Sequence, residues 1–154
     1  MDLYLMQHGE AKPESEDASR PLTERGRLEV ERVARIAGRI GLGIRLIEHS
    51  GKLRARQTAD IVAAHLQPHP RVEERSGLAP NDSPGDLARV LQDAGEPRLL
   101  VGHLPHLARL VSLLVTGDAS RPILAFRMGA LVALTREAEA YRIRFVLTPE
   151  LASD

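Results

Sequence analysis

Short apolar runs alternate along this chain with longer segments in which apolar residues recur at helical spacing. Residues 3–6 form the first apolar run and predict a buried strand, which ends at a Gln-His-Gly turn. A helix is then expected after Thr23, which has the character of an N-cap, and Gly41 and Gly43 end it. Strands that alternate with helices in this way predict βαβ units and a mainly parallel sheet with helices on both faces.

The same alternation continues to the end of the chain. Helices are expected at residues 53–66, 86–94 and 107–115, and strands at 44–47, near 72, at 99–101, 123–126, 131–135 and 141–147. The last three strands should form an antiparallel meander at one edge. We therefore expect an α/β fold with three layers, α/β/α: a mainly parallel sheet, antiparallel closing strands and no large cap domain. At 154 residues, the chain is expected to form a single domain over residues 1–154.

Composition excludes several kinds of partner. Lys and Arg together number 21, as do Asp and Glu, and the aromatic content is 3%, which argues against nucleic acid binding. The absence of cysteine rules out a disulfide framework and a thiolate zinc site, and it suits a cytoplasmic protein. We expect neither a signal peptide nor a membrane partner, because the first residues lack a basic region and no apolar run approaches ~20 residues.

Two histidines each follow a short apolar strand. If the strands that precede His8 and His103 are neighbours, both imidazoles project into one crevice at the carboxyl edge of the sheet. A neutral imidazole can act as a nucleophile towards phosphorus. Arginines such as Arg20 and Arg54 would depress its pKa and stabilise the oxygens of a transferring phosphoryl group. These residues therefore indicate phosphoryl-transfer chemistry.

The other histidines are expected to be structural or solvent-facing: His49, His65, His69 and His106. His65 and His69 have a spacing used by metal ligands on a helix, but Pro68 interrupts the helix between them. No metal site is expected.

Four segments occur in order along the chain: LYLMQHGEA at 3–11, RPLT at 20–23, SGKLRARQTA at 50–59 and VGHLP at 101–105. Together they resemble the histidine phosphatase superfamily, also called phosphoglycerate-mutase-like. Within it, the segments are most similar to those of the small bacterial phosphohistidine phosphatases of the SixA type. The resemblance extends from residue 3 to about residue 115, and less clearly to the closing strands.

The resemblance implies a role for each matching residue. His8, followed by Gly9, would be the nucleophile that becomes phosphorylated. Arg54 would bind the phosphoryl group, and His103 would contact it and assist transfer. Arg20 matches an arginine near the mouth of the pocket. The implied substrate is a phosphorylated protein histidine, on a phosphotransfer domain or similar carrier, and neither a metal nor an organic cofactor is implied.

The chain departs from the family pattern at three places. The family's first motif is Arg-His-Gly, and here Gln7 removes one phosphate-binding cation. Lys52 stands where the family usually has an apolar residue, and we hypothesise that it replaces the lost charge. A carboxylate general acid has no clear match: Glu73, Glu74 and Asp82 are the nearby choices, and Asp82, in a proline-bounded loop, is preferred. Two alternatives stay open: a phosphatase for small phosphate esters, and a catalytically weakened module that only binds phosphate.

Overall fold

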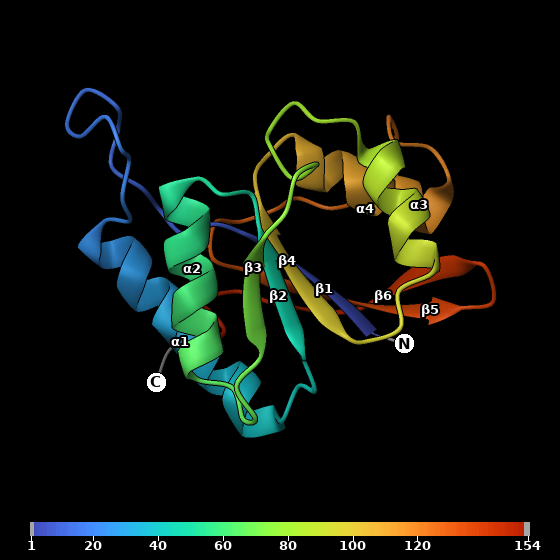
Figure 1. The fold of residues 1–154 in the computed structure, drawn as a ribbon, viewed down its shortest axis with the longest axis horizontal. Coiled ribbons are helices and arrows are strands. Elements are labelled where there is room, and N and C mark those ends of the chain that lie inside the picture. The colour runs from blue at the N-terminus through green and yellow to red at the C-terminus, as the bar shows by residue number, and fades with distance from the viewer. Residues whose placement is uncertain (1, 153–154) are drawn as a thin grey trace.

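The computed structural model describes residues 2–152, and it confirms the predicted α/β architecture (Figure 1). Helices and strands alternate as far as the last helix, and two strands then close the chain. The elements are β1 (Asp2–Gln7), α1 (Glu24–Ile40), β2 (Leu46–His49), α2 (Leu53–Ala64), β3 (Arg71–Glu74), α3 (Pro84–Gln92), β4 (Arg98–Gly102), α4 (His106–Thr116), β5 (Leu131–Glu137) and β6 (Ala140–Leu147).

One mixed sheet has the strand order β3-β2-β4-β1-β5-β6. Strands β3, β2, β4 and β1 are parallel to their neighbours, whereas β5 pairs antiparallel with β1 and β6 pairs antiparallel with β5. The predicted mainly parallel sheet with antiparallel closing strands is therefore confirmed. The parallel strands place their carboxyl ends at one edge of the sheet, which is where α/β proteins bind ligands.

Two apolar clusters fill the space on either side of the sheet. Tyr4 and Met6 of β1 point into the cluster with α1 and α2, and Leu3 and Leu5 point into the cluster with α3 and α4. Successive residues of a strand face opposite sides, so a strand buried on both faces is apolar throughout. This explains why the parallel strands appear in the sequence as continuous apolar runs and confirms the three layers.

The boundaries of α1 follow its capping residues. The Thr23 hydroxyl accepts a hydrogen bond from the Gly26 amide at 2.9 Å, as an N-cap does. Gly41 ends the helix in the left-handed conformation, with φ of 71°. Both caps agree with the sequence prediction.

One predicted strand is not found, and the bounds of several other elements differ from the prediction by one or two residues. Residues 123–126 were expected to form a strand but have no regular secondary structure, although Ile123 and Phe126 pack against the apolar cluster of α3 and α4. The place beside β1 is taken by β5, so this segment packs its half-buried side chains on the cluster without joining the sheet. Strand β2 begins at Leu46, two residues later than predicted, and it includes Glu48 and His49, which pair with β3 and β4.

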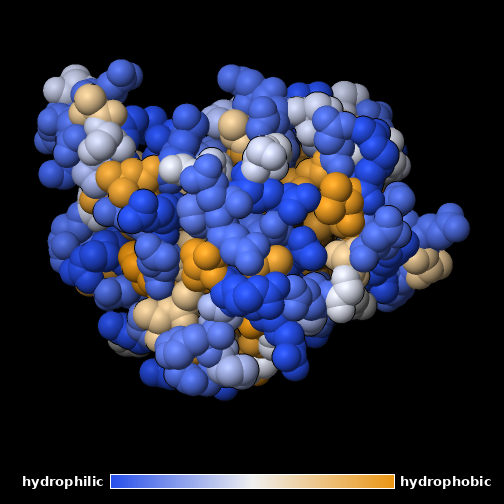
Figure 2. Space-filling model, in the orientation of Figure 1, coloured by the Kyte–Doolittle hydropathy of each residue, from blue (hydrophilic) through white to orange (hydrophobic). Residues whose placement is uncertain are grey.

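The surface seen in Figure 2 is mostly hydrophilic, and its hydrophobic residues lie in separate small areas. Within residues 2–152, no helix has both the length and the apolar character that a membrane span requires.

Candidate active site

The ends of β1 and β4 bring His8 and His103 together. Gln7 lies opposite Gly102 in the parallel register, and each histidine is the next residue of its chain segment. The His8 amide continues the pairing by donating to the Gly102 carbonyl at 3.1 Å. The centroids of the two imidazole rings are 5.0 Å apart. The two rings therefore lie side by side at the carboxyl edge of the sheet, as the sequence predicted.

The His8 ring is held in one tautomer. Its Nδ1 lies 2.7 Å from the Gly9 carbonyl oxygen, which can only accept a hydrogen bond, so Nδ1 carries the proton. Burial lowers the pKa of His8; the bond to Gly9 opposes this shift, and the charges of Arg54 and Arg20 lower the pKa further. The neutral ring then has its free lone pair on Nε2, as a nucleophile requires.

Gly9 is fixed between two helices. A Cβ atom at this position would lie 2.8 Å from Val30 Cγ2, so only glycine fits so closely against α1. The Gly9 amide donates to the Thr58 hydroxyl at 3.0 Å, and this hydroxyl donates to the Arg54 carbonyl at 2.8 Å. Thr58 thus joins the nucleophile's segment to the first turns of α2, which carry Arg54.

Arg54 and Arg20 supply positive charge beside the histidines. The Arg54 Nε is buried and has no hydrogen-bond partner among the described residues. Burial lowers the pKa of Arg54, and the neighbouring Arg20 guanidinium lowers it further. Neither arginine pairs with a carboxylate within residues 2–152, and Arg20 Nε donates to the Lys12 carbonyl at 3.1 Å. Two unpaired guanidinium groups in this position favour an anion.

Arg20 lies in the loop between β1 and α1. Hydrogen bonds of residues in the sequence motifs hold this loop against α2. Leu22 donates its amide to the Gln57 side-chain oxygen at 2.8 Å, and the Lys12 amide donates to the Pro21 carbonyl at 2.8 Å. These bonds join both sides of the loop between β1 and α1 and bring its basic residue towards the site.

His103 is also neutral. Burial is the largest cause of its low pKa, and His8, Arg54, Lys52 and His106 lower it further, to about 3. Its Nε2 lies 2.6 Å from the Ser50 hydroxyl oxygen. The Ser50 hydroxyl can donate to a bare Nε2 or accept from a protonated one, so it suits either tautomer.

Three further residues were predicted to belong to the site: Lys52, Gln7 and Asp82. Lys52 is exposed at the N-cap of α2, and its charge lowers the pKa of His103, so the ammonium acts on the site. Gln7 lines a hollow of about 400 Å³ with residues that include Leu104 and Phe126. Asp82 accepts a hydrogen bond from the Ala79 amide at 2.9 Å, and its carboxylate raises the pKa of His106.

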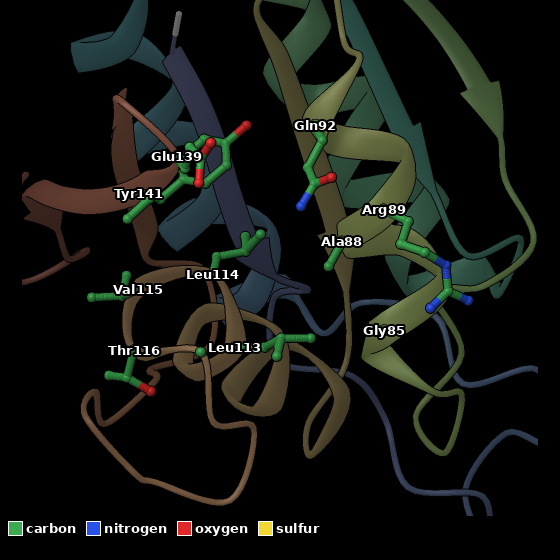
Figure 3. Close-up of a pocket in the computed structure, with 12 residues that line it drawn as sticks. Gly85, Ala88, Arg89, Gln92, Leu113, Leu114, Val115, Thr116, Glu139 and Tyr141 are labelled. Atoms are coloured by element: carbon green, nitrogen blue, oxygen red, sulfur yellow. The ribbon is translucent and has the colours of Figure 1, made fainter.

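A second hollow lies between α3 and the last turn of α4. It measures about 540 Å³ and is lined by side chains of both helices and of the β5–β6 turn, including Arg89, Leu113 and Tyr141 (Figure 3). It contains no histidine. Because α4 begins beside His103 and this hollow is formed by its last residues, the hollow is separate from the histidine pair.

Sequence reasoning gave no role to several residues that shape the site. Ser50, Gln57 and Thr58 lie within the 50–59 motif, which was the only signal that could have indicated them. His106 was expected to be structural, and it lies next to His103. The described residues contain no group of three or more metal-ligating side chains.

The fold and the site together define a phosphatase. A neutral imidazole whose Nε2 is free, a second imidazole, and guanidinium groups without a carboxylate partner among the described residues meet at the carboxyl edge of a three-layer α/β/α fold. The family model of the histidine phosphatase superfamily (branch 1) matches residues 3–79, and the chain belongs to this superfamily.

Three similar proteins can be compared with the chain, and the first two support this assignment. An uncharacterized protein of Picosynechococcus sp. is 40% identical over 126 residues, which cover 77% of this chain and 75% of the relative. A solved structure of the protein histidine phosphatase SixA complexed with tungstate is 27% identical, has a TM-score of 0.83 and matches 97% of both chains. A structure from Agrobacterium tumefaciens is 24% identical, has a TM-score of 0.79 and matches 96% of this chain and 97% of its own. This last likeness shows the fold alone.

The low pKa of His103 predicts how stability depends on pH. The unfolded chain binds a proton below about pH 6.5 that the native ring does not bind until about pH 3, so stability falls as the pH decreases across this window. One such proton contributes at most about 1.4 kcal/mol per pH unit. His103→Gln should flatten the slope of the unfolding free energy by up to this amount.

Urea unfolding at several pH values between about 4 and 6.5 measures this slope. His69→Gln, at an exposed position, is the matched control and should leave the slope unchanged. An unchanged slope in His103→Gln would show that the ring titrates normally in the folded protein.

Proposed function

We propose that this chain is a protein phosphohistidine phosphatase that works through a covalent phosphohistidine intermediate on His8. The observation that carries the proposal is the state of the His8 ring: neutral, with Nδ1–H bound to the Gly9 carbonyl and Nε2 free. Nearby guanidinium groups have no carboxylate partner among the described residues, so a phosphoryl group would complete their charge balance.

The reaction would proceed in two displacements. The Nε2 lone pair of His8 attacks phosphorus, the P–N bond of the substrate breaks, and the leaving imidazole takes up one proton. A water molecule then attacks the phosphorylated His8, the P–Nε2 bond breaks, and the water's proton passes to solvent with the release of phosphate. Arg54 and His103 stabilise the phosphoryl oxygens in both steps, and Gly9 keeps the nucleophile in its tautomer.

Phosphohistidine suits a site without a strong general acid. Its imidazole leaves more readily than an alkoxide and can take its proton from water or a weak donor. Asp82 is the proposed acid for poorer leaving groups. In this structure its Oδ2 accepts a hydrogen bond from the Ala79 amide, so Oδ1 would carry the proton that this role requires.

The open edge of the sheet supports a protein substrate. Apart from the sheet and its four flanking helices, residues 2–152 contain no helix or strand that could cover the site. The loops between β1 and α1 and between β3 and α3 rise along the same side of the molecule (Figure 1).

We further propose that residues 1–154 form one domain that acts in cytoplasmic signal transduction, on a histidine phosphotransfer domain or similar carrier.

A comparison of two substrates tests this function. The protein should release phosphate from chemically phosphorylated histidine in a carrier protein, without added metal, faster than from a chromogenic aryl phosphate. A clear preference for small esters would favour the ester phosphatase. Failure to release phosphate from either substrate, with phosphate still bound, would favour a binding module weakened by Gln7.

The nucleophile can be trapped directly. Rapid quenching of the working enzyme should yield an acid-labile, base-stable phosphoenzyme, because a phosphoramidate hydrolyses in acid. His8→Ala should abolish both turnover and the trapped species, with circular dichroism confirming the fold. His69→Ala at an exposed position should behave as wild type. The same phosphoenzyme in His8→Ala would assign the intermediate to another residue.

Arg54 should act mainly in the transition state. Its guanidinium lies beside the charge that develops on the phosphoryl oxygens, so Arg54→Ala should lower kcat about 100- to 1,000-fold and change KM much less. Arg56→Ala, at an exposed position on the same helix, is the matched control and should alter kcat little. Equal effects of the two substitutions would place the phosphoryl site elsewhere.

Lys52 and Gln7 should be energetically coupled. Gln7 offers an amide but no charge, and the charge of Lys52 reaches His103. We therefore expect Lys52→Ala to reduce activity strongly when Gln7 is present and much less once Gln7→Arg has restored the cation. A double-mutant cycle on kcat/KM measures this coupling. Strictly additive effects would show that Lys52 does not substitute for the missing arginine.

A further inference from the structure

His106 is a buried histidine for which the proposed reaction has no role. It is the first residue of α4, its side chain is fully buried, and neither ring nitrogen has a hydrogen-bond partner among the described residues. Buried polar groups are normally paired, because an unpaired one costs about 1–3 kcal/mol. An apolar side chain would avoid this cost, so the histidine needs an explanation.

His106 lies near His103, and each ring has a buried nitrogen without a partner among the described residues. The Leu107 amide donates to the His103 carbonyl at 2.9 Å, and this bond closes the turn between β4 and α4 that contains both histidines. His106 lies close enough to His103 to lower its pKa. The Nδ1 of His103 is also buried and has no partner within residues 2–152, while its Nε2 meets Ser50. The unpaired nitrogens of both rings thus occur in one turn.

The loop between β3 and α3 closes this region from the other side. A Cβ atom at Gly102 would lie 3.4 Å from the Leu78 carbonyl oxygen, so the loop packs against the residue that precedes His103. The turn from Ala79 to Asp82 is held by two hydrogen bonds between these residues, at 2.9 and 3.1 Å. This loop therefore packs beside the turn that contains His103 and His106, and the charge of its Asp82 acts on His106.

Charged and titratable groups on the neighbouring elements act on both rings. Burial is the largest cause of the low pKa of His106; Asp82 in the loop raises this pKa, and Arg109 in α4 lowers it. His103 is surrounded by His8, Arg54, Lys52 and His106, all of which lower its pKa. Both rings are therefore neutral in the free protein at neutral pH.

A bound phosphoryl group changes this balance at His103. Its negative charge stabilises the imidazolium, which takes a proton from solvent and donates from Nε2 to a phosphoryl oxygen. The Nδ1 of an imidazolium also carries a proton and needs an acceptor. Neutral His106 has one bare ring nitrogen, which is an acceptor in the same turn.

We propose that His106 is a positioning residue for His103: in the phosphoryl-bound protein it accepts a hydrogen bond from Nδ1–H of His103 and so stabilises the imidazolium. This inference rests on the proposed function only in that His103 contacts the phosphoryl group. His106 itself does not touch the substrate, because its side chain is fully buried. The pairing would also explain why a histidine occupies an otherwise apolar position.

Histidine ¹⁵N NMR of the full chain, titrated with inorganic phosphate, tests the pairing without turnover. In the wild type, phosphate should bring a protonated Nδ1 on His103 and a hydrogen-bonded acceptor nitrogen on His106. In His106→Leu, which keeps an apolar volume, the pKa of His103 in the phosphate complex should fall. His106→Gln retains an acceptor oxygen and should restore most of the change.

Kinetics provide a second readout. His106→Leu should lower kcat about 10- to 100-fold with little change in KM, by analogy with the outer partners of histidine ligands. The alkaline fall of the kcat profile, where His103 loses its proton, should move to lower pH. If His106 had a purely structural role, His106→Leu would change the melting temperature but leave the alkaline fall of the kcat profile at the same pH.

Two results would overturn the inference. One is a phosphate-saturated wild type in which Nδ1 of His103 stays unprotonated, which needs no variant and so does not depend on whether His106→Leu folds. The other is a folded His106→Leu protein with an unchanged pH profile. Failure of the phosphohistidine assay alone would contradict the proposed function and leave the phosphate titration to decide this pairing.

Discussion

The parallel pairing of β1 with β4 determines where the chemistry of this protein can occur. It runs from Leu3 opposite Arg98 to Gln7 opposite Gly102, and the His8 amide extends it to the Gly102 carbonyl. Parallel strands end at the same edge, so the pairing places His8 and His103 side by side although 95 residues separate them. The helices, in turn, are placed by the two faces of the same sheet.

Desolvation gives the histidines of the site their common character. Burial is the largest cause of the lowered pKa of His8, His103 and His106. In the proposed mechanism a protonated His8 could not attack phosphorus, so the packing that stabilises the fold would also keep this ring available as the nucleophile. The site also contains cations, among them Arg54 and Arg20, that have no carboxylate partner in the described residues, and their mutual repulsion is unfavourable. Such a group is stabilised when an anion binds.

The sequence predicted the frame of the fold because its signals are local. The Thr23 cap, the Gly41 stop and the apolar runs of β1 and β4 depend on neighbouring residues, and all three are found in the structure. The segment 123–126 shows where local patterns fail. Apolar residues indicate burial but not pairing, and the place beside β1 belongs to β5.

The site was predictable only in its main residues. The motifs indicated His8, Arg54 and His103, but the bonds that orient them involve Ser50 and Thr58, whose partners are distant in sequence. His106 has no recognisable pattern of its own. Its importance appears only when the turn after β4 and the loop from β3 are seen to enclose it. Tertiary contacts of this kind cannot be derived from composition or spacing.

The most direct test of the account is a crystal structure with vanadate bound. Vanadate adopts the geometry of a phosphoryl group in transfer, so it shows which side chains surround the reacting centre. We expect a vanadium atom bonded to Nε2 of His8, with its oxygens contacted by Arg54 and by Nε2 of His103. Vanadate bound away from His8, for example in the hollow between α3 and the last turn of α4, would contradict this mechanism.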